Sequence, residues 1–213
     1  MSRTIAGVRM PDSEMACEAA AFARFAQSQL LVHHALRAFV FAALTGERKE
    51  MTFDAELLYV GALFHHAGLD AKYRRSALRF EIDGANQARA FLRRHGADEC
   101  DVELVWNAIA LHTTPGIAEH MPPLVALVRA GVQMDLCGAG FDDFTPAQRE
   151  EIVLAFPRER GFKRRIIEEL ARGMEQRPET TFGTVNADVL DRADPNYTRL
   201  NFCGQVLGSN WAH

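Results

Sequence analysis

Residues 57–66 read LLYVGALFHH, an apolar run that ends in two adjacent histidines. The run from Leu57 to Phe64 contains no charged residue, and Asp54 shortly before it is of a residue type that caps helix N-termini. A helix that is apolar nearly all round must be buried, because no face of it suits water. We therefore expect a buried helix that carries His65 and His66 into the core or to its edge.

Three further stretches combine an apolar helical pattern with polar residues that can do chemistry. They are LLVHHALRAFVFAAL (30–44), with His33, His34 and Arg37; LVWNAIALH (104–112), ending at His112; and PLVALVRAGVQMD (123–135), ending at Asp135. Buried helices of this kind must pack against one another. The pattern therefore predicts that several imidazoles and one carboxylate lie close together in or beside the core.

These polar residues indicate a metal site. An isolated carboxylate or imidazolium is costly to bury, so such groups are paired or hold a cation. Imidazole nitrogens together with a carboxylate oxygen suit zinc, iron or manganese, and the partial negative charge of helix C-termini also favours a cation. We expect a divalent metal held by His34, His65 and Asp135, with His66 or His112 as a further ligand.

Each of these residues also has a purely structural interpretation. His34 and Arg37 could form the solvent-facing stripe of their helix. His65 and His66 could cap the last carbonyl groups of theirs, and Asp135 could form an ion pair with a nearby arginine. The metal hypothesis therefore depends on the set of residues and not on any single member.

The fold class expected from the sequence is all-α, a single-domain helical bundle. No segment alternates Val, Ile and Thr with polar residues as sheet strands do. Residues 1–176 are expected to form the helical domain, with Asp83 as the N-cap of its fourth helix. Residues 177–213 are richer in Asn, Thr, Gly and Asp and are expected to be an irregular C-terminal arm packed on that domain. The predicted helices cover 13–28, 30–45, 54–66, 84–95, 100–113, 122–137, 146–156 and 162–175.

Composition narrows the classes of function. The chain has 213 residues, of which 48% are hydrophobic and 24% charged, which excludes a disordered, fibrous or coiled-coil protein. With a net charge of −4, general attraction to nucleic acid or anionic membranes is not expected. The apolar runs are too short to span a membrane, and the four scattered cysteines are typical of reduced thiols. We expect a cytoplasmic protein with a small-molecule substrate, and a homo-oligomer is compatible with this composition.

The order of the polar residues resembles the HD-domain superfamily of metal-dependent hydrolases. The pattern of that family is a His on one helix, a His-Asp doublet on the next and a distant Asp on a later helix. Here residues 34–37 (HALR) are similar to the first segment and residues 62–69 (ALFHHAGL) to the second, and Asp135 takes the place of the last aspartate. The resemblance covers nearly the whole chain and implies a helical bundle of the HD-domain type.

Within the superfamily, the sequence is most similar to the cyanamide-hydratase-like branch and its bacterial relatives. The segments that carry this likeness are 79–85 (RFEIDGA), 108–113 (AIALHT) and 181–187 (TFGTVNA). One position departs from the family pattern, because His66 stands where the doublet has Asp. The resemblance then implies a metal held by His34, His65, His66 and Asp135 with one negative charge fewer, which favours Zn²⁺, or else Fe²⁺ or Ni²⁺.

The resemblance implies a metal-dependent hydratase or hydrolase, of hydro-lyase type where water adds to a nitrile or cyanamide. Metal-activated water would attack the small polar electrophile. Glu81 is the candidate acid or base, although it could instead be a surface carboxylate paired with a neighbouring arginine. His112 is the candidate for orienting the substrate or supporting a ligand. The candidate substrate-binding residues are Arg37, Lys72 and Arg79.

Two other functions remain open at this point. The basic residues Lys72, Arg74, Arg75 and Arg79 could hold a phosphate, which favours an HD-type phosphohydrolase of a small phosphate ester or nucleotide. The replacement of the family Asp by His66 instead favours a catalytically silent HD-fold module that binds a ligand or partner.

Overall fold

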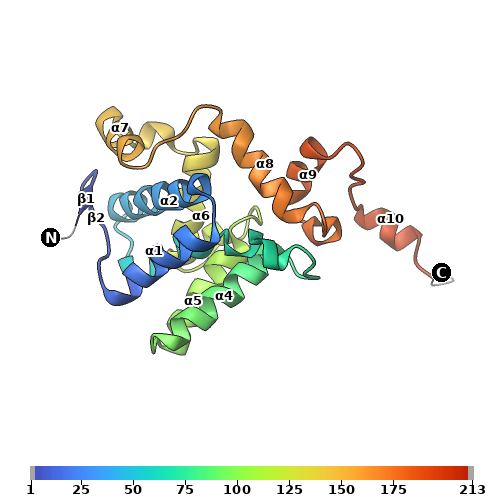
Figure 1. The fold of residues 1–213 in the computed structure, drawn as a ribbon, viewed down its shortest axis with the longest axis horizontal. Helices are drawn as coiled ribbons and strands as arrows, with labels where there is room; N and C mark the ends of the chain where they lie inside the picture. The colour runs from blue at the N-terminus through green and yellow to red at the C-terminus, as the bar shows by residue number, and fades with distance from the viewer. Residues whose placement is uncertain (1–2, 211–213) are drawn as a thin grey trace.

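The computed structural model describes residues 3–210 and is all-α apart from one short hairpin (Figure 1). The hairpin pairs β1 with β2 in antiparallel register, Thr4 opposite Arg9. The strands and α-helices are β1 (Thr4–Ile5), β2 (Val8–Arg9), α1 (Glu14–Ala26), α2 (Gln29–Arg48), α3 (Ala55–Phe64), α4 (Phe80–Arg94), α5 (Glu99–Leu111), α6 (Pro123–Cys137), α7 (Pro146–Ala155), α8 (Phe162–Met174), α9 (Asn186–Ala193) and α10 (Phe202–Leu207).

Local capping explains where several helices begin. The side chain of Ser13 accepts a hydrogen bond from Ala16 N at the start of α1, and Asp54 accepts from Leu57 N at the start of α3. Both starts were expected from the sequence. By contrast, the prediction that Asp83 caps the fourth helix is wrong, because α4 begins at Phe80 and Asp83 lies buried in its first turn.

The centre of the molecule is the contact between α2 and α6. Most of α2 is buried, from Leu30 to Gly46, and Gly131 of α6 lies against its backbone. A Cβ atom at position 131 would lie 2.0 Å from the carbonyl oxygen of Ala38, so only glycine permits this close approach. The close packing brings His34 on α2 next to the last turn of α6, which carries Asp135.

A second close approach fixes the turn that follows the histidine doublet. A Cβ atom at Gly68 would lie 1.9 Å from the carbonyl oxygen of Phe80, so this turn is pressed against the first turn of α4. Because His66 directly precedes the turn, its ring contacts the ring of Phe80, with centroids 5.9 Å apart. The doublet is therefore held between α2, α3 and α4.

The C-terminal segment is more regular than expected, since it contains α9 and α10. Arg177, at its start, is fully buried and donates hydrogen bonds to the carbonyl oxygens of Gly68 (2.6 Å) and Leu78 (3.0 Å). Arg177 also forms an ion pair with Asp83 at 2.5 Å, which accounts for the buried carboxylate in α4. In Figure 1, α9 lies beside α8, whereas α10 extends beyond the bundle. The proposed division at residue 176 stays a prediction.

Two negative findings concern the described part of the chain. Within residues 3–210, no helix combines the length and the apolar character needed to cross a membrane. The four cysteines, Cys17, Cys100, Cys137 and Cys203, are exposed and form no disulfide with one another.

Candidate metal centre

Four buried histidines lie together where α2, α3 and α5 meet. His34 comes from the middle of α2, His65 follows the last residue of α3, His66 comes next, and His112 follows the last residue of α5. Candidate ligand atoms of His34, His65 and His66 all lie within 4.8 Å of one another. The ring of His112 lies 5.0 Å from that of His65 and 5.9 Å from that of His66, centroid to centroid. We call these four residues the histidine cluster.

The ends of α3 and α5 position their histidines in the same way. His65 and His112 have nearly identical backbone angles, and each uses its Nδ1–H to donate to the carbonyl three residues earlier. These hydrogen bonds, to Ala62 and Ile109, are both 2.6 Å long. Because Nδ1 carries the hydrogen, the Nε2 atom of each neutral ring carries a lone pair. Each Nε2 atom is thereby prepared as an acceptor or metal ligand.

The geometry between His34 and His65 requires a positive species between them. Their Nε2 atoms are 3.2 Å apart, and the Nδ1 atom of each ring already donates elsewhere, His34 to Asp135 at 2.6 Å. Two lone pairs at this distance repel one another, so a proton or a cation must lie between the nitrogens. The buried Nδ1 of His66 and Nε2 of His112 have no partner among the described residues. The cluster therefore fits a divalent metal ion, which imidazole nitrogens bind well.

Burial keeps the histidines neutral and so available to a cation. Burial lowers the pKa of His65 and His66 well below the usual value, and the neighbouring histidines lower both further. Burial also lowers the pKa of His112 to about 4. At neutral pH these three rings carry no proton charge that would oppose metal binding.

Asp135 lies behind His34, on the side away from the other histidines. Its carboxylate accepts hydrogen bonds from His34 Nδ1, from Arg37 Nε (2.8 Å) and Nη2 (2.9 Å), and from Arg158 (2.8 Å). Burial by itself raises the pKa of Asp135, but the bonds from His34 and Arg37 outweigh it and lower the pKa well below the usual range. Asp135 thus orients His34 in this structure. Its role as a direct metal ligand stays a prediction.

Glu81 occupies a different environment, between α4, α5 and the C-terminal segment. Its Oε1 accepts hydrogen bonds from the Thr113 hydroxyl and from Asn186 Nδ2, the latter at 2.8 Å. Its buried Oε2 has no partner among the described residues. Burial raises the pKa of Glu81, and the hydrogen bonds from these neutral groups only partly offset the rise. Glu81 is therefore not the surface carboxylate that one interpretation of the sequence suggested.

The three predicted substrate-binding residues do not line the cavity beside the histidines. Arg37 is fully buried against Asp135, Arg79 donates to the carbonyl oxygen of Phe182 at 2.7 Å, and Lys72 donates to Gln87 at 3.1 Å. His66 instead borders a cavity of about 170 Å³. We call it the His66 cavity; its charged lining residues are Asp70, Arg74, Glu169 and Arg172.

Sequence reasoning missed several residues that the fold brings to the centre. Arg158 and Asn186 contact Asp135 and Glu81 from segments outside the predicted motifs, although Asn186 lies in the tail segment 181–187. Arg172 carried no local signal, since it is one of several basic residues of α8. Only the packing of α8 against the turn after His66 places Arg172 at the His66 cavity.

Comparison with known families gives one match. The family model described as "HD domain" matches residues 31–137, which include the histidine cluster, Glu81 and Asp135. No protein of curated function matches the sequence, so the likeness to the cyanamide-hydratase-like branch stays a prediction. The match spans half of the chain, and the helices that it covers are the ones that assemble the centre. The protein therefore belongs to the HD-domain family, whose members are in general metal-dependent hydrolases.

Proposed function

We propose that this protein is a metal-dependent hydratase or hydrolase of a small, neutral, polar electrophile, of which a nitrile or cyanamide is the model. The observation that carries the proposal is the pair of facing Nε2 atoms of His34 and His65, with His66 beside them. His34, His65 and His66 would hold the ion, and the nitrogen-rich set favours zinc over magnesium. A bound divalent ion would supply a nucleophile at neutral pH by lowering the pKa of water.

The His66 cavity supports a small neutral substrate. Its volume of about 170 Å³ is below the ~300 Å³ at which ordinary ligand pockets begin. Its lining carries two positive groups, Arg74 and Arg172, and two negative groups, Asp70 and Glu169, so its formal charges cancel. Arg172 also donates to Glu169 at 3.1 Å, which leaves it less available to a substrate anion.

Glu81 and His112 supply the remaining chemistry of the proposed reaction. Because its pKa is raised, Glu81 can hold a proton closer to neutral pH than an ordinary carboxyl group can. The nitrogen of an attacked nitrile needs such a proton. His112, next to the Thr113 that bonds Glu81, presents an unpartnered Nε2 with which it can orient a polar substrate or complete the ligand set.

A second candidate reaction is the hydrolysis of a small phosphate ester. Arg74 favours it, because among the described residues its guanidinium has no hydrogen bond or ion pair and it lines the cavity that His66 borders. A free guanidinium is a good partner for a phosphate group. Arg74→Gln should then raise KM for the phosphate ester, whereas hydration of a neutral nitrile should change little.

The first experiment measures metal content per chain by mass spectrometry in the wild type, His65→Ala, His66→Asp and His95→Ala. His95 is the matched control, because it also caps a helix C-terminus but lies outside the cluster. We expect bound metal in the wild type and His95→Ala, loss in His65→Ala, and equal or higher content in His66→Asp, which restores a carboxylate. Metal-free wild type, even after zinc is offered, would contradict the proposal and support the silent binding module.

The second experiment separates the two reactions with the metal-loaded protein. Urea formation from cyanamide and phosphate release from p-nitrophenyl phosphate are measured side by side, in the wild type and Glu81→Gln. Urea formation that falls in Glu81→Gln while metal content is kept supports the hydratase. Phosphate release without urea formation supports the phosphohydrolase, and the absence of both products contradicts each substrate class.

A further inference from the structure

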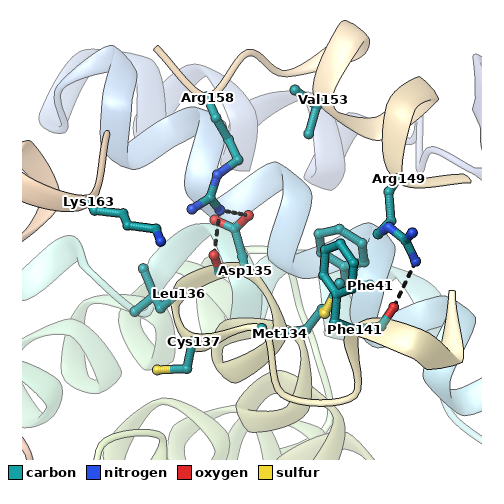
Figure 2. Close-up of a pocket in the computed structure, with 11 residues that line it drawn as sticks. Phe41, Met134, Asp135, Leu136, Cys137, Phe141, Arg149, Val153, Arg158 and Lys163 are labelled. Carbon is teal, nitrogen blue, oxygen red and sulfur yellow. Dashed lines mark hydrogen bonds and ion pairs between the residues drawn. The ribbon is translucent and has the colours of Figure 1, made fainter. Parts of the chain in front are cut away.

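A second cavity lies on the far side of Asp135 from the histidine cluster. It has a volume of about 290 Å³ and lies between the last turn of α6, α7 and the first turn of α8 (Figure 2). We call it the Asp135 cavity. It shares no lining residue with the His66 cavity. Its apolar wall is formed by Phe41, Met134, Leu136, Phe141 and Val153.

One end of the Asp135 cavity carries an excess of positive charge. Figure 2 shows Arg158 and Lys163 reaching this end from two sides. Arg158 donates to both the carboxylate and the carbonyl oxygen of Asp135, and Arg37 holds the same carboxylate from behind. Three positive side chains therefore surround one negative side chain, which leaves two positive charges uncompensated. Within residues 3–210, Lys163 has no hydrogen bond or ion pair.

The other basic residue of this cavity is already engaged. Arg149 donates to the carbonyl oxygens of Phe141 and Phe144, and its guanidinium lies 3.9 Å from the ring centroid of Phe141. Arg149 thus closes the apolar end and leaves the Lys163 end to bind a ligand. An ammonium without a partner beside an apolar wall is the arrangement that suits an anion with an apolar body, because each half of such a ligand meets its own kind of surface.

We propose that the Asp135 cavity binds a small organic monocarboxylate with an aromatic or aliphatic body. The carboxylate would contact Lys163 and the outer face of Arg158, and the body would pack against Phe41, Phe141 and Val153. The cavity volume is close to the ~300 Å³ lower end of ordinary ligand pockets, so the ligand is small. This site is separate from the proposed catalytic cavity and does not depend on the reaction proposed there.

The test is calorimetric titration of the full-length protein, as purified, with 3-phenylpropanoate as the probe. We expect one binding site per chain. Propanoate, which lacks the ring, and 3-phenylpropanamide, which lacks the charge, should each bind at least about tenfold more weakly, a difference of ~1.4 kcal/mol. An amide that binds as well as the acid would overturn the proposal, as would the absence of any binding of 3-phenylpropanoate.

Variants place the probe within the protein. Lys163→Gln should weaken binding about tenfold, Lys163→Arg should retain it, and Val153→Trp, which fills the cavity, should abolish it. Arg164→Gln is the matched control, because it removes a positive charge from the next residue, which pairs with Glu168 outside the cavity.

The two cavities are separated by Arg172→Gln. If this variant loses probe binding while Lys163→Gln keeps it, the probe occupies the His66 cavity and the proposal is wrong. Lys163 is exposed, so its substitution should not disturb folding. The result therefore remains decisive even if Val153→Trp fails to fold.

Discussion

Two buried carboxylates in this protein have pKa values shifted in opposite directions. Asp135, between α2 and α6, has a lowered pKa, and Glu81, between α4, α5 and the C-terminal segment, has a raised one. Both side chains are almost fully buried. The difference lies in their partners: Asp135 accepts hydrogen bonds from two arginines and a histidine, whereas Glu81 accepts them from a hydroxyl and an amide.

The comparison shows that the charge state of a buried acid depends on its neighbours more than on its depth. Burial opposes ionisation in both cases, and only a nearby positive charge overcomes it. Asp135 is therefore an ionised anchor that holds Arg37 and orients His34. Glu81 is a group that can hold and release a proton. The two roles could not be exchanged without exchanging the surrounding residues.

The largest effect is expected from Asp135→Asn, which breaks the first of these regions. Arg37 is fully buried, so removing its counter-charge leaves a positive charge without compensation. We expect the free energy of unfolding to fall by about 3–5 kcal/mol, measured by urea denaturation. Asp143→Asn is the control, because its pair with Arg48 is exposed and should contribute at most ~1 kcal/mol. Equal effects of the two variants would contradict the anchoring role of Asp135.

A smaller effect is expected from Asn186→Ala, in the second region. This change removes a neutral donor from Glu81 Oε1 and links the C-terminal segment less firmly to α4. Because the partner is a buried acceptor, the free energy of unfolding should fall by about 1–3 kcal/mol. Asn196→Ala, at an exposed position, should change it little. If Asn186→Ala matched Asp135→Asn in cost, neutral and charged partners would not differ as the comparison requires.

The smallest effect concerns pH and sharpens the comparison without breaking the fold. Burial raises the pKa of Glu81 in the folded protein above its ordinary value of 4.5, so folding takes up a proton between the two values. The stability from protonated Glu81 is fully present below the unfolded pKa and is lost as pH rises through the folded one. Glu81→Gln stays neutral, so it should gain stability relative to the wild type as pH increases through this window.

The measurement for Glu81→Gln is a series of urea denaturation curves for both proteins between about pH 4 and pH 8. The difference in unfolding free energy should move in favour of the variant and then level off. A difference that is constant with pH, or that moves in favour of the wild type, would mean that the pKa of Glu81 is not raised.

Local patterns in the sequence were sufficient for the helices and for most of their starts. Apolar periodicity and capping residues act within one or two turns of chain, so Ser13 and Asp54 mark true helix starts. Asp83 misled for the same reason: its sequence context suits a cap, but its partner, Arg177, lies 94 residues further along the chain. No local pattern can indicate an ion pair over that distance.

The sequence by itself determined an all-α chain whose buried helices end in histidines, because burial of an apolar helix follows from its composition alone. Only the tertiary structure decided which nitrogens face one another, which carboxylate is held by arginines and which by neutral groups, and where the two cavities lie. The physical reason is range. Helix formation depends on neighbours a few residues apart, whereas His34 meets Asp135 across 101 residues through the packing of α2 on α6.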